Sequence, residues 1–315
     1  MNAGVLPAVE DVKTAAGRIH ADVRRTPVQP WDENSGLWLK LESLQPTGSF
    51  KVRGAANHLR GMGHGVTGVI TASSGNHGQA VAYMASRLGI PAVIVVPESV
   101  TQLKQAGIAR YGAEMVRCGT TMPERSALAA RLASERGLHL VPSFDDPLVI
   151  AGQGTCGLEI LDQCPDAAAV VVPTGGGGLI SGIALVIKTL RPSIRVIGAE
   201  PRAVARFAAS RAAGARVTVA SVATIADGLR GQQPGVLTWD ATSRYVDAFV
   251  SVDETAMLEA VRRLCVDAHL VVEPSGAIAL AALLTGLVPE RPAVAVVSGG
   301  NLDPALLASL LSPAD

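Results

Sequence analysis

Lys51 is the residue whose type and setting most directly suggest chemistry in this sequence. It lies in QPTGSFKVRGA (residues 45–55), and it is one of five lysines among 27 basic residues. A basic residue that serves solubility alone can be arginine, as it usually is in this chain. An amine that must lose its proton and attack a carbon atom cannot be arginine, because a guanidinium stays charged at any workable pH. The pattern therefore predicts that Lys51 is a nucleophile.

A run of four glycines, Gly175 to Gly178, predicts a phosphate site. A strand-like apolar run precedes it in VVVPTGGGGLISG (170–182), and a helical segment follows. Residues without side chains let backbone N–H groups converge, and the helix dipole adds partial positive charge there. The loop lacks the Gly-Lys-Ser/Thr ending of a nucleoside triphosphate site, and Ile180 and Ser181 replace the glycine of a dinucleotide fingerprint. The remaining candidate is a single phosphate monoester.

A GxGxxG string is formed elsewhere by Gly152, Gly154 and Gly157 in AGQGTCG. It follows a turn rather than a clear strand, and no acidic residue lies about twenty positions later, as a dinucleotide site requires. We interpret this string as the start of a helix.

The segment TASSGNHGQ (71–79) predicts a carboxylate-binding loop. It lies between a strand-like run and a helix, and it is rich in hydroxyls and backbone donors. An ordinary helix cap would use one of Ser73, Ser74 and Asn76 and would not need all of them. A lone histidine such as His77 is more often structural than catalytic. The six histidines show no HExxH or paired Cys/His spacing, and no GxSxG is present, so a catalytic zinc and a serine hydrolase are disfavoured.

Together, a lysine nucleophile, a monophosphate site and a carboxylate loop describe an amino-acid enzyme that uses pyridoxal 5'-phosphate. The lysine would form an imine with the cofactor, the glycines would bind its phosphate, and the hydroxyl-rich loop would take the substrate carboxylate.

Composition limits the other function classes. The chain has 315 residues, 48% of them hydrophobic and 17% charged, which is typical of a folded globular protein. Its formal net charge of zero disfavours nucleic acid and anionic membranes as partners. Four cysteines without CxxC spacing indicate free thiols in a reducing compartment. We see no secretory signal, and the longest apolar stretch (277–288) is too short to span a bilayer, so we expect a cytoplasmic protein.

The elements that must position these residues alternate between short apolar runs and longer helical segments. Strands are expected near residues 68–70, 91–97, 114–118, 168–173, 194–200 and 293–298, with helices between most of them. Continuous apolar strands that alternate with amphipathic helices predict an α/β fold whose mostly parallel sheet is covered on both faces.

Four segments carry a family resemblance: PTGSFKVRGA, SSGNHGQAVA, PTGGGGLISG and VSGGN. They resemble, in the family's order, the signature segments of fold-type II pyridoxal-phosphate enzymes, and more narrowly the serine/threonine dehydratase and serine racemase branch. The resemblance extends from about residue 24 to residue 305. It implies two three-layer α/β domains of the tryptophan synthase β-like type. The large cofactor-binding domain would comprise residues 1–64 and 145–315, and a small inserted α/β domain residues 65–144.

The same resemblance implies a role for each matching residue. Lys51 would form the internal aldimine, Phe50 would pack against the cofactor, and Asn76 would hydrogen-bond its phenolic oxygen. Ser298 would face the pyridine nitrogen, with Gly228 and Glu273 nearby, and Gly175, Gly176, Gly177 and Gly178 would bind the phosphate. The substrate carboxylate would be surrounded by Ser73, Ser74, Gly75, Asn76 and His77.

A hydroxyl such as Ser298 cannot hold the ring nitrogen protonated as a carboxylate would, which favours elimination over transamination. We therefore expect an ammonia-lyase that converts L-threonine, L-serine or both to a 2-oxo acid and ammonia. The substrate would displace Lys51, whose freed amine would remove the Cα proton before the β-hydroxyl departs.

Four positions and one segment bear on the alternative activities. Ser74 resembles the residue of racemases that acts on the face opposite the lysine, and Arg125 aligns with an arginine of racemases and hydroxyaspartate dehydratases, although it fits a solvated helix residue equally well. Glu200 matches a glutamate of the divalent-cation site in metal-activated racemases. Arg206, however, stands where those racemases have a second carboxylate. After TIADG (224–228) the chain reads LRGQQPG, which is closer to bacterial dehydratases. Serine racemisation and 3-hydroxyaspartate dehydration therefore stay as alternatives to the main expectation.

Two interpretations from other classes stay open. A non-catalytic relative could retain the cofactor, but it would have little reason to keep Lys51 beside an intact carboxylate loop. A β-replacement enzyme similar to cysteine synthase would share the fold but usually has a different asparagine loop. We expect no appended effector-binding domain after VSGGN and one more helix, and a homodimer is a possibility that the family suggests.

Overall fold

The apolar runs of the sequence form the central strands of two sheets. The computed structural model describes residues 4–63 and 65–312. A six-stranded sheet has the order β1 (Val28–Pro30), β2 (Leu37–Leu41), β10 (Ala293–Val297), β7 (Ala169–Pro173), β8 (Arg195–Pro201) and β9 (Ala248–Val252). Only β1 is antiparallel to its neighbour; the other pairings are parallel. Strands β10 and β7 are buried along their whole length, as an apolar run covered on both faces must be.

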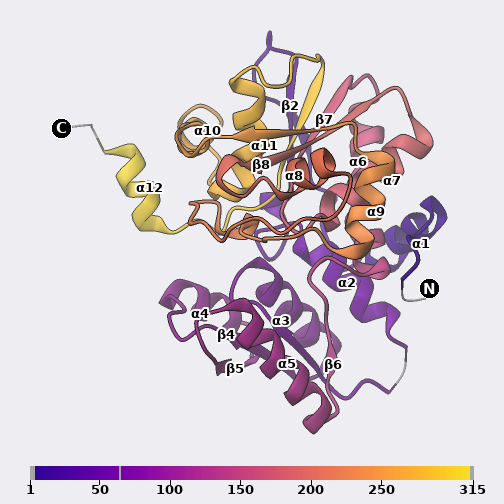
Figure 1. The fold of residues 1–315 in the computed structure, drawn as a ribbon, viewed down its shortest axis with the longest axis vertical. Coiled ribbons are helices and arrows are strands. Elements are labelled where there is room, and N and C mark those ends of the chain that lie inside the picture. The colour runs from indigo at the N-terminus through magenta and orange to yellow at the C-terminus, as the bar shows by residue number, and fades with distance from the viewer. Residues whose placement is uncertain (1–3, 64, 313–315) are drawn as a thin grey trace.

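The second sheet has four parallel strands, all of which come from residues 69–140. Its order is β5 (Glu114–Arg117), β4 (Ala92–Val96), β3 (Val69–Ala72) and β6 (His139–Leu140). Figure 1 shows this sheet and its helices as the lower body of the molecule, with the six-stranded sheet above. We call these two bodies the small and the large domain, and we retain residues 65–144 as the proposed bounds of the small one.

Helices cover both faces of each sheet. In the large domain α10 (Glu254–Val266) and α11 (Pro274–Leu284) pack on one face, and α6 (Pro147–Gln163) and α7 (Gly178–Leu190) pack on the other. In the small domain α3 (Asn76–Leu88) and α4 (Gln102–Ala109) pack on one face together with α2 (Lys51–Gly61), and α5 (Met122–Arg136) packs on the other. Both domains therefore have three layers, as the family resemblance implied.

The remaining helices lie around this frame. They are α1 (Val9–Ile19), α8 (Arg206–Ala213), α9 (Val236–Tyr245) and α12 (Pro304–Leu311), together with the 3-10 turns η1 (Glu42–Leu44), η2 (Arg202–Val204) and η3 (Asp227–Leu229). No helix of the described chain is both long enough and apolar enough to cross a membrane.

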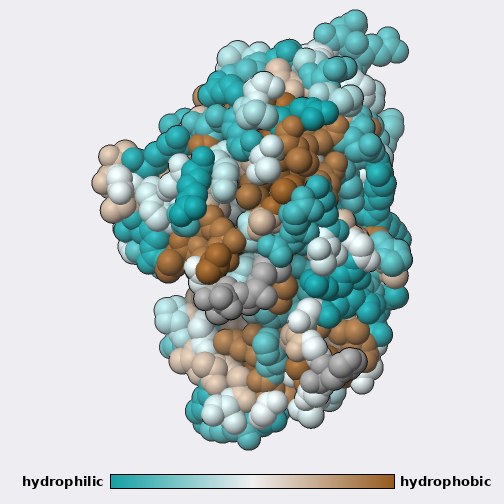
Figure 2. Space-filling model, turned by 90° about the vertical axis from the view of Figure 1, so that its right-hand side faces the viewer, coloured by the Kyte–Doolittle hydropathy of each residue, from teal (hydrophilic) through white to brown (hydrophobic). Residues whose placement is uncertain are grey.

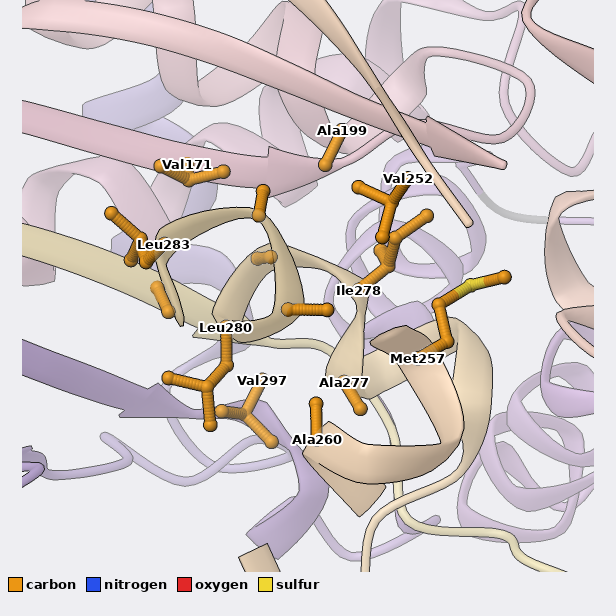
Figure 3. Close-up of a cluster of buried hydrophobic side chains, with 14 of the residues drawn as sticks. Val171, Ala199, Val252, Met257, Ala260, Ala277, Ile278, Leu280, Leu283 and Val297 are labelled. Carbon is orange, nitrogen blue, oxygen red and sulfur yellow. The ribbon is translucent and has the colours of Figure 1, made fainter. Parts of the chain in front are cut away.

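Figure 3 shows the core around α11, a helix that is buried along almost its whole length. Small and large apolar side chains alternate there, so the helix lies close to the sheet on one side and to α10 on the other. The labelled residues come from α11, from α10 and from four strands: Ala277, Ile278, Leu280, Leu283, Met257, Ala260, Val171, Ala199, Val252 and Val297. This packing fixes the ends of the strands from which the loops of the site emerge.

One expectation about the helices was wrong. Gly152, Gly154 and Gly157 do not start a helix, because α6 begins at Pro147 with Asp146 as its cap and the glycines lie in its interior. A Cβ atom at Gly152 would lie 2.6 Å from the carbonyl oxygen of Arg53 in α2. The glycines are therefore explained by close helix packing, which a single sequence does not distinguish from a turn.

Candidate active site

Lys51 is the first residue of α2. It follows the short segment, residues 45–50, that connects η1 to this helix. The backbone N–H of Phe50 donates to the carbonyl of Ser298 (3.0 Å), which fixes this segment to the end of β10. The Lys51 amine donates to the carbonyl of Ser143 (2.7 Å) and lies 5.3 Å from the ring centroid of Phe50. Burial lowers the pKa of this amine to about 8, so the neutral form is a minor but accessible fraction near physiological pH.

The glycine loop connects β7 to α7. Gly177 has φ +93°, and a Cβ atom there would lie 2.6 Å from the Phe207 ring. A Cβ at Gly176 would lie 2.4 Å from the ring of Phe144, the neighbour of the Ser143 carbonyl that Lys51 contacts. The structure thus excludes side chains at both positions. Among the described residues, no protein acceptor is hydrogen-bonded to the N–H groups of Gly175, Gly176 and Gly177.

The loop after β3 leads into α3 through Gly75, which occupies the cap position without a side-chain cap. Within residues 4–63 and 65–312, neither Ser73 nor Ser74 uses its hydroxyl in a protein hydrogen bond. The N–H groups of the first helical turn also have no intrahelical partner. The hydroxyls and the helix N-terminus therefore remain available to a ligand such as a carboxylate.

His77 follows in the first turn of α3 and is buried. Burial and the nearby Lys51 charge lower the pKa of His77 to about 3. Its Nε2 lies 3.3 Å from the carbonyl of Val141, to which a neutral ring can donate. The imidazole is therefore neutral at physiological pH and cannot hold a substrate carboxylate as a cation.

Asn76 is held by two side chains from the large domain. Its Nδ2 donates to Glu273 Oε1 (2.6 Å), and its Oδ1 accepts from Nδ2 of Asn301 (2.7 Å), which also donates to the carbonyl of Thr47 (2.9 Å). Burial, followed by the charge of Asp227, raises the pKa of Glu273 to about 8. One N–H of the Asn76 amide is left for a ligand. Asn301 was not among the residues expected from the sequence, although it is the last residue of VSGGN.

Gly228 and Ser298 complete the arrangement. The N–H of Gly228 donates to Oγ of Ser275 (3.0 Å), two residues after Glu273, and its carbonyl lies 3.1 Å from where a Cβ of Gly175 would be. Ser298 is buried at the end of β10, where its carbonyl holds Phe50. The structure therefore places the expected cofactor residues in one connected neighbourhood.

Two expected residues make no direct described contact with the other residues expected at the site. Arg125 lies near the start of α5, and its guanidinium contacts only Sδ of Met122 (4.0 Å), while its Nε and Nη1 are buried without a partner in the described part of the chain. Glu200 accepts from the N–H groups of Phe207 (3.0 Å) and Ala208 (2.9 Å), so both of its oxygens cap α8. No group of three or more His, Cys, Asp or Glu able to hold a metal occurs in residues 4–63 and 65–312.

These residues fit pyridoxal phosphate. Unpaired backbone N–H groups in the glycine loop suit a phosphate, and the free hydrogen of the Asn76 amide suits an oxygen acceptor. The Lys51 amine, with its lowered pKa, suits an aldehyde. A hydroxyl at Ser298 suits an unprotonated ring nitrogen.

Comparisons with known proteins agree with this chemistry. Residues 19–299 match the family model described as "Pyridoxal-phosphate dependent enzyme". The chain is 42% identical over 301 residues to L-threonine ammonia-lyase of Geobacter sulfurreducens, an alignment that covers 93% of this chain and 75% of that one. It is 40% identical over 306 residues to serine racemase of Arabidopsis thaliana, covering 93% and 92% of the two chains. The solved structure of maize serine racemase is 38% identical, with a TM-score of 0.92 and 97% of each chain covered.

Proposed function

Because the chain belongs to the family of pyridoxal-phosphate dependent enzymes, we propose that it is an ammonia-lyase that converts L-threonine, L-serine or both to a 2-oxo acid and ammonia by α,β-elimination. The observation that carries this proposal is the Lys51 amine, whose pKa is lowered to about 8. It donates to the carbonyl of Ser143, and the next residue, Phe144, packs against Gly176 of the glycine loop. An amine with this pKa can take a proton near neutral pH and return it, as a general base requires.

The roles that we propose for the residues combine the family resemblance with the contacts described above. Gly175 to Gly178 would bind the phosphate of the cofactor, Asn76 its phenolic oxygen and Ser298 its ring nitrogen, while Phe50 packs beside Lys51. Ser73, Ser74 and the first-turn N–H groups of α3 would hold the substrate carboxylate. His77, neutral and bonded to Val141, would shape this loop rather than carry charge.

Pyridoxal phosphate, when bound, supplies an electron-withdrawing group for the amino acid. The amine of Lys51 would then take the Cα proton of the substrate. The electron pair of that C–H bond would form the Cα–Cβ double bond, and the β-hydroxyl would take a proton from the ammonium of Lys51 and leave as water. The enamine released from the site tautomerises, and water replaces its nitrogen to give the 2-oxo acid and ammonia.

Racemisation is the second candidate, because serine racemases are relatives at an identity close to that of the ammonia-lyases. It needs an acid on the face opposite Lys51, and Ser74 is the residue that would supply it. Within the described residues the Ser74 hydroxyl has no hydrogen-bonded base, so its proton would have to be restored by solvent or by the ligand. The segment LRGQQPG after TIADG, which is closer to bacterial dehydratases, favours elimination as the main reaction.

The first prediction concerns Lys51. Replacement by alanine should abolish the cofactor absorbance band and reduce 2-oxo acid formation by at least about a thousand-fold, the scale of removing a catalytic base and covalent anchor. Lys13→Ala is the matched control, because Lys13 is an exposed lysine paired with Glu10 on α1. Absorbance spectra and a coupled 2-oxo acid assay on both purified variants measure the two effects.

The substrate panel should contain L-serine, L-threonine and 3-hydroxyaspartate. The last is included because the buried, unpartnered nitrogens of Arg125 would suit a second carboxylate. Chiral chromatography of serine in the same reactions separates the two candidates. Formation of D-serine faster than pyruvate would make racemisation the main activity, and Lys51→Ala with normal turnover would end the proposal.

A further inference from the structure

Arg206 is a buried cation that the mechanism above does not use. It is the first residue of α8, and its side chain is completely inaccessible to solvent. No salt bridge joins it to a carboxylate among the described residues. Burial lowers the pKa of Arg206, but a guanidinium remains protonated at any pH at which the protein is folded. A buried charge of this kind requires compensating dipoles.

Backbone carbonyls supply that compensation. Nε of Arg206 donates to the carbonyl of Gly175 (3.0 Å), and Nη2 donates to the carbonyls of Thr174 (2.9 Å) and Gly175. Nη1 donates to the carbonyls of Val204 (2.8 Å) and Leu229 (3.0 Å). All five N–H groups of the guanidinium are therefore used. One side chain ties together the glycine loop, the turn before α8 and η3.

The peptide geometry gives these contacts a directional consequence. In a trans peptide the carbonyl of one residue and the N–H of the next point in opposite directions. Because the carbonyls of Thr174 and Gly175 point at Arg206, the N–H groups of Gly175 and Gly176 point away from it. Thr238 does the same for the next peptide, since its Oγ1 donates to the carbonyl of Gly176 (2.9 Å). The three N–H groups oriented in this way, those of Gly175, Gly176 and Gly177, are the ones that have no protein acceptor among the described residues.

The start of α8 is itself fixed. Both carboxylate oxygens of Glu200 accept from N–H groups in the first turn of α8, at Phe207 and Ala208. Glu200 lies on β8, the strand beside β7 from which the glycine loop departs. Arg206 is thus attached to the same sheet as the loop that it holds.

We propose that Arg206 is a positioning residue of the phosphate site: it turns the peptides of the glycine loop so that their N–H groups converge on the phosphate, and it places a fixed positive charge behind them. The inference rests on the proposed role of this loop and concerns binding of the phosphate, not the reaction.

The test compares pyridoxal 5'-phosphate with pyridoxal, which lacks the phosphate, as ligands of the cofactor-free protein. In Arg206→Met we expect the dissociation constant of pyridoxal phosphate to rise at least about ten-fold, the scale of one charge-assisted hydrogen bond. The dissociation constant of pyridoxal should change by no more than about two-fold, because it makes no contact with the loop N–H groups. Arg211→Met is the control, since Arg211 lies on the same helix, is exposed and makes one hydrogen bond, to the carbonyl of Val246.

A purely structural role would give a different pattern. In that case Arg206→Met would lower stability to urea and weaken both ligands equally, and this result would overturn the proposal. Arg206→Lys serves if the methionine variant does not fold, because it keeps the charge but offers three donors from a single point. We expect a selective loss of about three-fold for that variant, and equal losses for the two ligands would again contradict the inference. Failure to form a 2-oxo acid would leave these binding results unaffected.

Discussion

At the scale of the residue, burial lowers the pKa of Lys51, so that this amine, unlike that of an exposed lysine, can exchange a proton near neutral pH. The same burial acts with opposite sign on Glu273, whose pKa it raises to about 8, and with the same sign on His77, whose pKa it lowers to about 3. Each shift disfavours the charged form, as desolvation must. At neutral pH this leaves Asn76 between a largely protonated Glu273 and Asn301, so the orientation of its amide is set by hydrogen bonds rather than by charge.

A pH prediction follows for the capture of the cofactor. Only the neutral amine attacks an aldehyde, and the lowered pKa of Lys51 means that this form appears as the pH rises through about 8. The rate at which cofactor-free protein reacts with pyridoxal phosphate should therefore rise about ten-fold between pH 7 and pH 9 and then level off. Stopped-flow absorbance across this range measures it. A rate that keeps rising towards pH 10.5, as for an ordinary lysine, would show that the amine is not desolvated.

At the scale of the element, α7 carries the glycine loop at its N-terminus and is positioned by close packing against α6. A Cβ atom at Gly182 of α7 would lie 2.4 Å from the backbone nitrogen of Gly154 and 2.4 Å from the carbonyl oxygen of Ile150 in α6. Backbone-to-backbone approach of this kind leaves nothing flexible to move aside. The orientation of the loop therefore depends on glycines that lie outside it.

Gly182→Ala should consequently reduce the free energy of unfolding by about 1–3 kcal/mol, the usual range for overpacking, and should also weaken cofactor binding. Gly17→Ala is the matched control. Gly17 lies exposed in α1 with no atom within 4 Å of the position that a Cβ would occupy, so alanine there should stabilise the protein by up to about 1 kcal/mol. Urea denaturation of both variants gives the values. An equal free energy of unfolding for Gly182→Ala and Gly17→Ala would contradict this expectation, because it would mean that α6 and α7 can move apart without loss of stability.

At the scale of the whole molecule, the two domains are joined by polar contacts around the site. Figure 2 shows the outline indented at its left edge, where the upper and lower bodies meet. Lys104 on α4 of the small domain pairs with Asp227 on η3 of the large one (2.5 Å), and Asn76 bonds Glu273. Because Asp227 precedes Gly228, this exposed ion pair links the position of the small domain to the cofactor neighbourhood.

Lys104→Ala should leave the free energy of unfolding within about 1 kcal/mol of the original, since an exposed ion pair contributes little to stability. It should raise KM for the amino-acid substrate by up to about five-fold, because the small domain carries the proposed carboxylate loop and would be held less firmly against η3. Arg136→Ala breaks a similarly exposed pair with Glu114 inside the small domain and should change neither value. An unchanged KM in Lys104→Ala would show that the pair does not position the proposed carboxylate loop.

Much of the fold could be predicted from local patterns. The apolar runs that became β3, β4, β7, β8 and β10 were identifiable because a strand covered on both faces is mostly apolar. Strands β9 (Ala248–Val252) and β2 were not identified, although β2 is mostly buried, since their pairing depends on distant neighbours. The interior glycines of α6 were misread for the same reason, because the helix that approaches them lies in another part of the chain.

The sequence by itself pointed to the cofactor: residue types and short spacings predict a lysine nucleophile, a glycine loop for a phosphate and a hydroxyl-rich loop. Only the tertiary structure decided which side chains hydrogen-bond to the residues of these segments and orient them. Asn301 lies 225 positions from Asn76, and Arg206 lies 31 positions from Gly175, yet each is in hydrogen-bond contact with it. Residues so far apart in the sequence can form hydrogen bonds only once the sheets have brought the ends of the strands together. Burial likewise shifts the pKa of a side chain only when the surrounding atoms are in place.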